Sequence, residues 1–191
     1  MATERVFCRF TRGKDPFSIH EIPEDGMCLS SFLLVSPLGR PNEVLVGRMN
    51  PEAPWDHLGG LGPDRVEVHR RGWMLPSSQL LLGEGPEEAA RRIRTEQLGG
   101  LPVSFEPVRI ASEVYTPRRF PGNRYHWDLQ FLYRGTTATL EAPRHPAWSE
   151  LAFVDVPATP ARDFARAHDE VLELLGLHPG AQGASSPPGG R

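Results

Sequence analysis

Apolar positions divide the chain into short runs, and their spacing predicts several strands. Five runs that alternate or stay apolar between Pro and Gly turn signals are expected to be strands: 27–35, 43–48, 107–115, 125–133 and 151–156. The second run follows the turn Pro37-Leu38-Gly39, so we expect it to return beside the first. Residues 49–64 are rich in Pro and Gly and predict a long loop, which in a compact domain is often functional.

Two other segments have the period of a helix. Residues 86–98 begin with Pro86 and two glutamates, which suit a first helical turn, and Gly99 follows as a stop signal. Residues 162–175 place Phe164, Val171 and Leu174 at helical spacing. The order of elements therefore predicts an α/β (α+β) domain with a mixed β-sheet and two main helices.

Composition limits the class of protein. The length of 191 residues fits one domain, expected at 27–176, after an N-terminal arm or extra strand at 1–26 and before a disordered tail at 177–191. A net charge of −3 gives no overall attraction to nucleic acid, and no apolar run is long enough to span a membrane. Cys8 and Cys28 form no metal-ligand pattern, and the N-terminus has no signal-peptide core. We expect a cytoplasmic protein, for which a homodimer stays possible.

Residues 75–99 (LPSSQLLLGEGPEEAARRIRTEQLG) contain a motif with coherent spacing. Its marked positions are Leu75-Pro76, Gly83-Glu84, Pro86-Glu87-Glu88-Ala89-Ala90, Arg92, Glu96 and Gly99. The segment resembles the Nudix box of the nucleoside-diphosphate-X hydrolases. The resemblance covers about residues 27–176 and implies a Nudix-like α/β/α sandwich. It also implies hydrolysis of a phosphoanhydride with the help of Mg²⁺ or Mn²⁺.

Three positions depart from the box. Ser78 replaces the first Gly, Ile93 replaces the Glu after the Arg, and Gln97 replaces the second Glu of the Glu-Glu pair. The resemblance implies that three glutamates on one helix face hold the metal, and hard cations need such oxygen ligands. Sliding the alignment by one residue puts Ile93 in the aliphatic position, but Glu96 is still the only acid of the three. Either alignment predicts an eroded, weak site for Mg²⁺ or Mn²⁺.

Three box glutamates are candidate catalytic residues. Glu96 stands at a metal-ligand position, although it could instead form an i,i+4 ion pair with Arg92. Glu88 lies two turns earlier on the same face and could supply a substitute metal ligand or be a solvated charge. Glu84 matches the loop glutamate of the family, which commonly supports the box helix through its Arg.

Several residues outside the box are candidates for ligand binding. Arg118, Arg119 and Arg124 surround a Pro-Gly turn and could bind a phosphate, although charged turns are common. His126 and Asp128 alternate along a strand and could act as a base and its orienting acid. Trp55 lies in the long polar loop and is the best candidate for an exposed residue that stacks on a nucleobase.

Three functions follow from this pattern. The first is a Nudix-superfamily protein with an eroded metal site, which binds a nucleotide-like or phosphoanhydride ligand with weak or no hydrolysis. The second is an active hydrolase of a nucleoside diphosphate derivative that uses Glu84, Glu88 or Glu96. The third is a protein-interaction scaffold. A close acid cluster that holds Mg²⁺ would favour the second. A pocket with Arg and Trp but no acid cluster would favour the first, and a filled or apolar site with a large exposed patch would favour the third.

Overall fold

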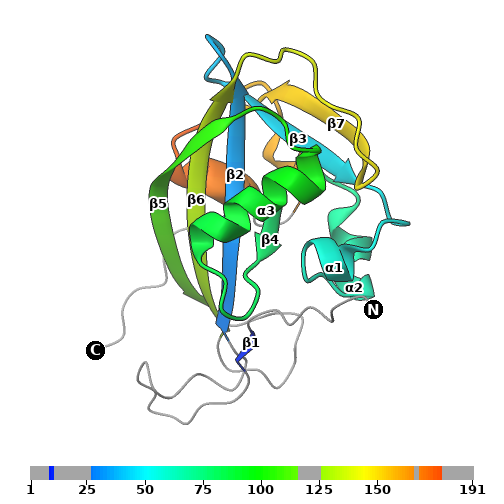
Figure 1. Cartoon of the computed structure of the whole chain (residues 1–191), viewed down its shortest axis with the longest axis vertical. Coiled ribbons are helices and arrows are strands. Elements are labelled where there is room, and N and C mark those ends of the chain that lie inside the picture. The colour runs from blue at the N-terminus through cyan, green and yellow to red at the C-terminus, as the bar shows by residue number, and fades with distance from the viewer. Residues whose placement is uncertain (1–8, 11–26, 116–125, 166–167, 178–191) are drawn as a thin grey trace.

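The computed structural model describes residues 9–10, 27–115, 126–165 and 168–177 (Figure 1). Its strands are β1 (Arg9–Phe10), β2 (Met27–Pro37), β3 (Glu43–Met49), β4 (Ser77–Gln79), β5 (Ser104–Tyr115), β6 (His126–Thr137) and β7 (Trp148–Asp155). Its helices are α1 (Trp55–Leu58), α2 (Pro63–His69), α3 (Pro86–Leu98) and α4 (His168–Leu174), with a 3-10 turn at Ala161–Asp163.

The strands form two sheets. The larger has five strands in the order β1-β2-β6-β5, with β4 paired to β2. It is mixed, as predicted, because β2 and β6 run parallel while β5 runs antiparallel to β6. β3 pairs with β7 in a separate two-stranded sheet, so the expectation that it returns beside β2 is wrong. β6 pairs along the whole of one edge of β2, and β1 and β4 pair with the other edge between residues 27 and 32, whereas β3 takes β7 as its partner over its full length.

Helices cover both faces of the sheets, which confirms the α/β/α sandwich (Figure 1). Successive side chains of a strand point to opposite faces. On one face, Leu33 and Leu45 pack with Ile93 of α3. On the other face, Leu34 and Val44 pack with residues of α4. Each helix therefore closes its own hydrophobic layer, and β2 and β3 contribute to both layers.

Two segments differ from their predicted structure. The expected loop at 49–64 contains α1 and the start of α2, which has Pro63 in its first turn. The helix expected at 162–175 is described as helix α4 over His168–Leu174. Earlier in this segment, Ala161–Asp163 form the 3-10 turn and Phe164 is extended; Trp73 N donates to Asp163 O and Ala165 N donates to Trp73 O, both at 2.8 Å. These two bonds replace the helical hydrogen bonds that Asp163 O and Ala165 N would make in the expected helix.

The ends of the chain are described only in part. Within the expected arm at 1–26, Arg9–Phe10 form β1 and pair with Met27 and Cys28 of β2. The other residues of the arm and residues 178–191 of the expected tail lie outside the described residues, so both boundaries stay predictions. Among the helices of the described segments, none is long and apolar enough to cross a membrane.

Candidate functional site

The box helix α3 has the predicted bounds and is fixed at both ends. At its start, the backbone N–H of Gly85 donates to Glu88 Oε2 at 2.8 Å, and Ser31 Oγ of β2 donates to Pro86 O at 3.0 Å. At its end, Gly99 adopts the left-handed conformation with φ of 60°. The carboxylate of Glu88 is therefore used to cap the helix on which it lies.

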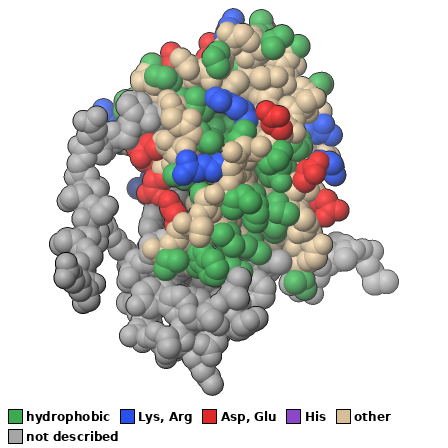
Figure 2. Space-filling view, turned by 90° about the vertical axis from the view of Figure 1, so that its left-hand side faces the viewer, with side chains coloured by type: hydrophobic (Ala, Val, Ile, Leu, Met, Phe, Trp, Pro, Cys, Tyr) green, Lys and Arg blue, Asp and Glu red, His purple; other side chains and the backbone are tan. Residues whose placement is uncertain are grey.

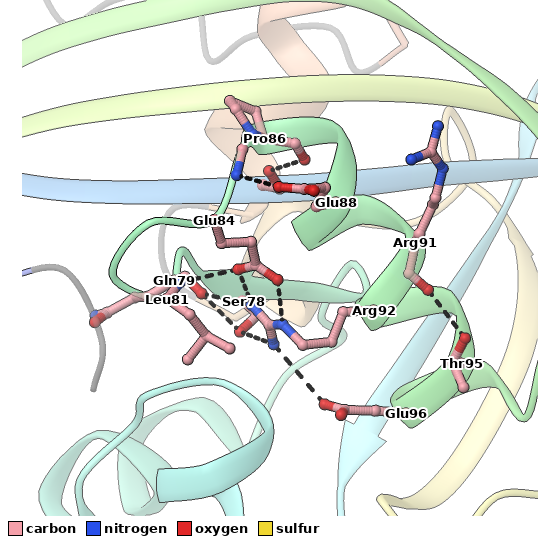
Figure 3. Close-up of polar contacts among 12 residues, drawn as sticks. Ser78, Gln79, Leu81, Glu84, Pro86, Glu88, Arg91, Arg92, Thr95 and Glu96 are labelled. Atoms are coloured by element: carbon pink, nitrogen blue, oxygen red, sulfur yellow. Dashed lines mark hydrogen bonds and ion pairs between the residues drawn. The ribbon is translucent and has the colours of Figure 1, made fainter. Parts of the chain in front are cut away.

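Glu84 and Arg92 form the central ion pair of the box (Figure 3). Arg92 Nε donates to Glu84 Oε1 at 2.7 Å and its Nη2 donates to Oε2 at 2.8 Å. Glu84 Oε2 also accepts the backbone N–H of Leu81 at 2.9 Å. Both side chains are only 11% exposed, so this two-bond pair is well shielded from water. The structural role predicted for Glu84 fits this geometry.

The remaining contacts of Arg92 join the helix to the strand β4. Its Nη1 donates to Ser78 Oγ at 3.1 Å, and its Nη2 donates to Gln79 O at 3.0 Å. Glu96 lies one turn further along α3, with Oε2 at 3.8 Å from Arg92 Nη1 (Figure 3). The i,i+4 ion pair considered from the sequence is therefore present. Ser78, which replaces a box glycine, supplies a hydroxyl to this network.

Ile93 stands where the box has a glutamate, and it belongs to the hydrophobic core. Its side chain has no exposed surface and packs in one cluster with Leu33, Leu45 and Leu98. The cluster also contains Ala90, one turn earlier on α3. A hydrocarbon in this position offers no ligand to a cation, and the space that a carboxylate would need is filled by packed side chains.

Gln97 stands where the box has a second glutamate, and it is fully buried. Its Nε2 donates to Ser77 O at 2.8 Å and to Leu58 O at 3.2 Å, while its Oε1 accepts the backbone N–H of Ser77 at 3.2 Å. A carboxylate could not make the first two bonds, because it has no proton to donate. The amide therefore links α3 to α1 and β4.

These contacts test whether the box could hold the divalent metal that the resemblance implies. Within the described ranges, no group of three or more His, Cys, Asp or Glu side chains is placed to bind a metal ion. Glu84 is bonded to Arg92, and Glu88 caps the helix. Mg²⁺ needs several oxygen ligands in nearly octahedral geometry. The donor set of this helix therefore does not fit such a metal.

Trp55 is not the exposed stacking residue that we expected. It is 1% exposed, its Nε1 donates to Asn50 O at 2.9 Å, and its ring packs edge-on against Trp148 at 5.0 Å between centroids. The expectation is wrong because α1 turns this ring into a small core with Leu58 and Leu61. The apolar spacing of Trp55, Leu58 and Leu61 was the available signal, and the surrounding polar residues obscured it.

The other predicted ligand-binding residues are only partly described. Arg118, Arg119 and Arg124 lie outside the described residues. His126 begins β6, and its side chain is also outside them. Asp128 is half-buried in β6, directly across from Glu113 of β5. The structure therefore leaves the arginine-rich turn and the His126–Asp128 pair as predictions.

His168 is a buried polar residue that the sequence analysis missed. Its Nδ1 accepts the backbone N–H of Leu75 at 3.1 Å, which requires the neutral ring with its proton on Nε2. Burial, with a smaller contribution from the nearby His69, lowers the pKa of His168 to about 3. The sequence gives no sign that His168 would be buried and accept a backbone hydrogen bond, because a single histidine near the start of a helix can equally be exposed.

Comparisons with known proteins find likeness only at the level of structure. No protein-family model matches the sequence, and no curated protein matches it. The NUDIX domain of Shewanella oneidensis NrtR, complexed with ADP ribose, has a TM-score of 0.52 at 16% identity, over 78% of this chain and 86% of that chain. The E. coli dihydroneopterin triphosphate pyrophosphohydrolase has a TM-score of 0.52 at 11% identity, over 77% and 93%. A MutT protein from Methanosarcina mazei has a TM-score of 0.53 at 13% identity, over 80% and 95%.

Proposed function

We propose that this chain, which has the Nudix fold, binds a nucleotide-like or phosphoanhydride ligand with weak or no Mg²⁺-dependent hydrolysis. The observation that carries the proposal is the state of two box positions: Ile93 is part of the core, and Gln97 donates to two backbone carbonyls. The ligand class is taken from proteins of the same fold, one of which was solved with ADP ribose.

The loss of hydrolysis follows from the chemistry of the helix face. Hydrolysis of a phosphoanhydride on such a face needs carboxylates that hold the cation and activate a water. All three candidate glutamates have partners: Glu84 is bonded to Arg92, Glu88 caps the helix N-terminus, and Glu96 Oε2 lies 3.8 Å from Arg92 Nη1. Losing a general base alone costs about 10²–10⁴-fold in rate. These partners also disfavour the alternative of an active hydrolase that uses Glu84 or Glu88.

Binding does not need the missing acids. The turn that carries Arg118, Arg119 and Arg124 joins β5 to β6, whose ends pair at Tyr115 and His126. Guanidinium groups bind phosphate oxygens through paired hydrogen bonds. In this proposal the arginines contact the phosphates, while His126 and Asp128 lie on the adjoining strand.

Calorimetric titration with ADP-ribose tests the binding half of the proposal. We expect saturable binding both with Mg²⁺ and with a chelator present. Replacing Arg118 and Arg119 with Ala should weaken it by ~1.5–3 kcal/mol for each charged hydrogen bond that is lost. Arg40→Ala is the matched control, because this exposed arginine lies in the turn after β2 and pairs with Glu43 at the start of β3. No heat with ADP-ribose, AMP or ribose 5-phosphate would contradict ligand binding and favour a scaffold.

A turnover assay tests the catalytic half separately. ADP-ribose, dinucleoside polyphosphates and nucleoside triphosphates should be hydrolysed slowly or not at all with Mg²⁺ or Mn²⁺, beside an active Nudix hydrolase as positive control. Turnover at ~1–10 s⁻¹, the range of ordinary enzymes, would overturn this half. In that case Glu96→Gln would show whether the remaining box acid is the working ligand.

A further inference from the structure

The strand β5 lies at the edge of the larger sheet and is long. It has 12 residues and pairs with β6, while its other side has no neighbouring strand within the described sheet. An edge strand offers a row of backbone N–H and C=O groups that can pair with another chain. Proteins usually block such an edge with proline, lysine or a bulge. Here Pro107 and a register shift between Pro107 and Arg109 protect the first half alone.

The unprotected half of β5, residues 109–115, has exposed apolar side chains. Ile110 is 66% exposed and Val114 is 54% exposed. Together with Val108, they are three of the six large apolar side chains that are exposed in the described segments. Figure 2 shows apolar side chains gathered on the side of the molecule that carries β5. Such a concentration on one edge strand is typical of an interaction surface.

The same half of the strand is complementary to itself. In an antiparallel pair of two copies centred on Ala111, Arg109 of each copy lies opposite Glu113 of the other, so two opposite-charge pairs form by symmetry. Ile110 then lies opposite Ser112 and diagonal to Val114 of the second copy, within reach of a long side chain. Arg109 uses one N–H to donate to Leu174 O and has four others for such a pair.

We propose that β5 is a homodimer interface, in which residues 109–113 of two copies pair antiparallel about Ala111 and extend the larger sheets into one. The partner is a second copy of the chain, because the charges of Arg109 and Glu113 are complementary to those of the same segment running in the opposite direction. This inference is independent of the proposed function, because it uses none of the box residues.

Sedimentation equilibrium over the micromolar range tests the interface by charge exchange. Wild-type protein should show a concentration-dependent dimer. Arg109→Glu and Glu113→Arg should each raise the dissociation constant by about tenfold or more, because each places like charges opposite one another twice. The double variant Arg109→Glu/Glu113→Arg should restore wild-type dimerisation. This rescue would not occur if either single change acted by damaging the fold.

Ile110→Lys adds an independent test of the apolar part of the interface. We expect it to give a monomer, while Leu140→Lys, at a 56% exposed apolar residue outside β5, should leave the dimer unchanged. Circular dichroism would establish that both variants fold. The proposal is overturned if wild-type protein stays monomeric, if Ile110→Lys remains a dimer, or if the double charge exchange fails to restore dimerisation.

Discussion

The side chain of Gln97 exchanges two hydrogen bonds with the backbone of Ser77. Nε2 donates to Ser77 O at 2.8 Å, and Oε1 accepts the N–H of Ser77 at 3.2 Å. The backbone O of Gln97 also accepts the indole N–H of Trp148 at 2.8 Å. One residue of α3 therefore joins β4, the strand that precedes the box helix, to the strand β7 of the smaller sheet. This explains physically why an amide is suited to a position where the box has an acid.

Gln97→Glu should destabilise the protein by ~3 kcal/mol or more. The new carboxylate would be buried and would face the carbonyls of Ser77 and Leu58 without a proton to donate. Urea unfolding measures the change. Gln97→Met is the matched variant, since it removes the bonds without adding charge, and it should cost less. Equal stability of Gln97→Glu and wild type would show that the site accepts an acid and would weaken the case for an eroded box.

Glu84→Gln should cost ~1.5–3 kcal/mol, because it breaks a shielded ion pair and leaves the guanidinium of Arg92 partly unsatisfied. The control is Glu87→Gln. Glu87 pairs with Arg91 on the same helix, but both of these side chains are more than half exposed, so the expected cost is about 0–0.5 kcal/mol. A loss that is no larger for Glu84 than for Glu87 would remove the structural role of Glu84 and leave it as a candidate catalytic residue.

His168 should make stability depend on pH. Its pKa is lowered to about 3 in the folded protein, first by burial and then by His69, while an unfolded histidine titrates near its ordinary value. The unfolded state therefore binds more protons in this window, and stability falls as pH drops from ~6.5 towards 3. By pH ~4.5 the loss should be ~2–3 kcal/mol.

The variant His168→Gln separates this contribution from the other titrating groups. Glutamine can accept the N–H of Leu75 but does not titrate, so the variant should lose less stability than wild type over the same pH range. Urea unfolding at several pH values gives both curves. His145, whose pKa is lowered by burial as well, contributes with the same sign and is present in both proteins. Parallel curves for the two proteins would contradict the assignment to His168.

The sequence predicted those parts of the fold that depend on local signals. Pro86 and Gly99 mark the two ends of α3 because a proline in the first turn and a left-handed glycine act locally. The strands β5, β6 and β7 were found through their alternation, with bounds that differ by a few residues. The pairing of β3 with β7 could not be predicted in this way, since register between distant strands depends on which sheet edges are free.

The candidate site was predicted unevenly for a related reason. The resemblance to the box implied a contact between Glu84 and Arg92, and this ion pair is present in the structure. Trp55 was assigned wrongly because its burial depends on contact with Trp148, which is distant in the sequence. The sequence shows that Gln97 stands where the box has a glutamate. Its hydrogen bonds to Ser77 and Leu58 could not be predicted, because they form only when α3, β4 and α1 come together in the folded protein. Contacts between residues that are distant in the sequence cannot be inferred from amino-acid composition.

Ile93→Glu should destabilise the protein rather than rebuild a metal site. Ile93 has no exposed surface and packs with Leu33 and Leu45, so the variant would bury a charge in the core at a cost of ~3–5 kcal/mol. Ile93→Val, the matched control, keeps the apolar contact and should cost ~0.5–1.5 kcal/mol. Thermal unfolding followed by circular dichroism compares the two variants with wild type.

Adding Mg²⁺ to Ile93→Glu distinguishes a damaged core from a restored site. An ion that binds only the folded state raises stability by RT ln(1 + [L]/Kd), which is ~2.7 kcal/mol at a hundredfold excess over Kd. We expect no such rise, because Gln97 donates to carbonyls and Glu84 is held by Arg92, so a new acid at position 93 would find few partner ligands. A Mg²⁺-dependent increase in Tm that wild type lacks would show that this helix face can still assemble a metal site. A single acid added at position 93 would then be sufficient to create metal binding on this helix face.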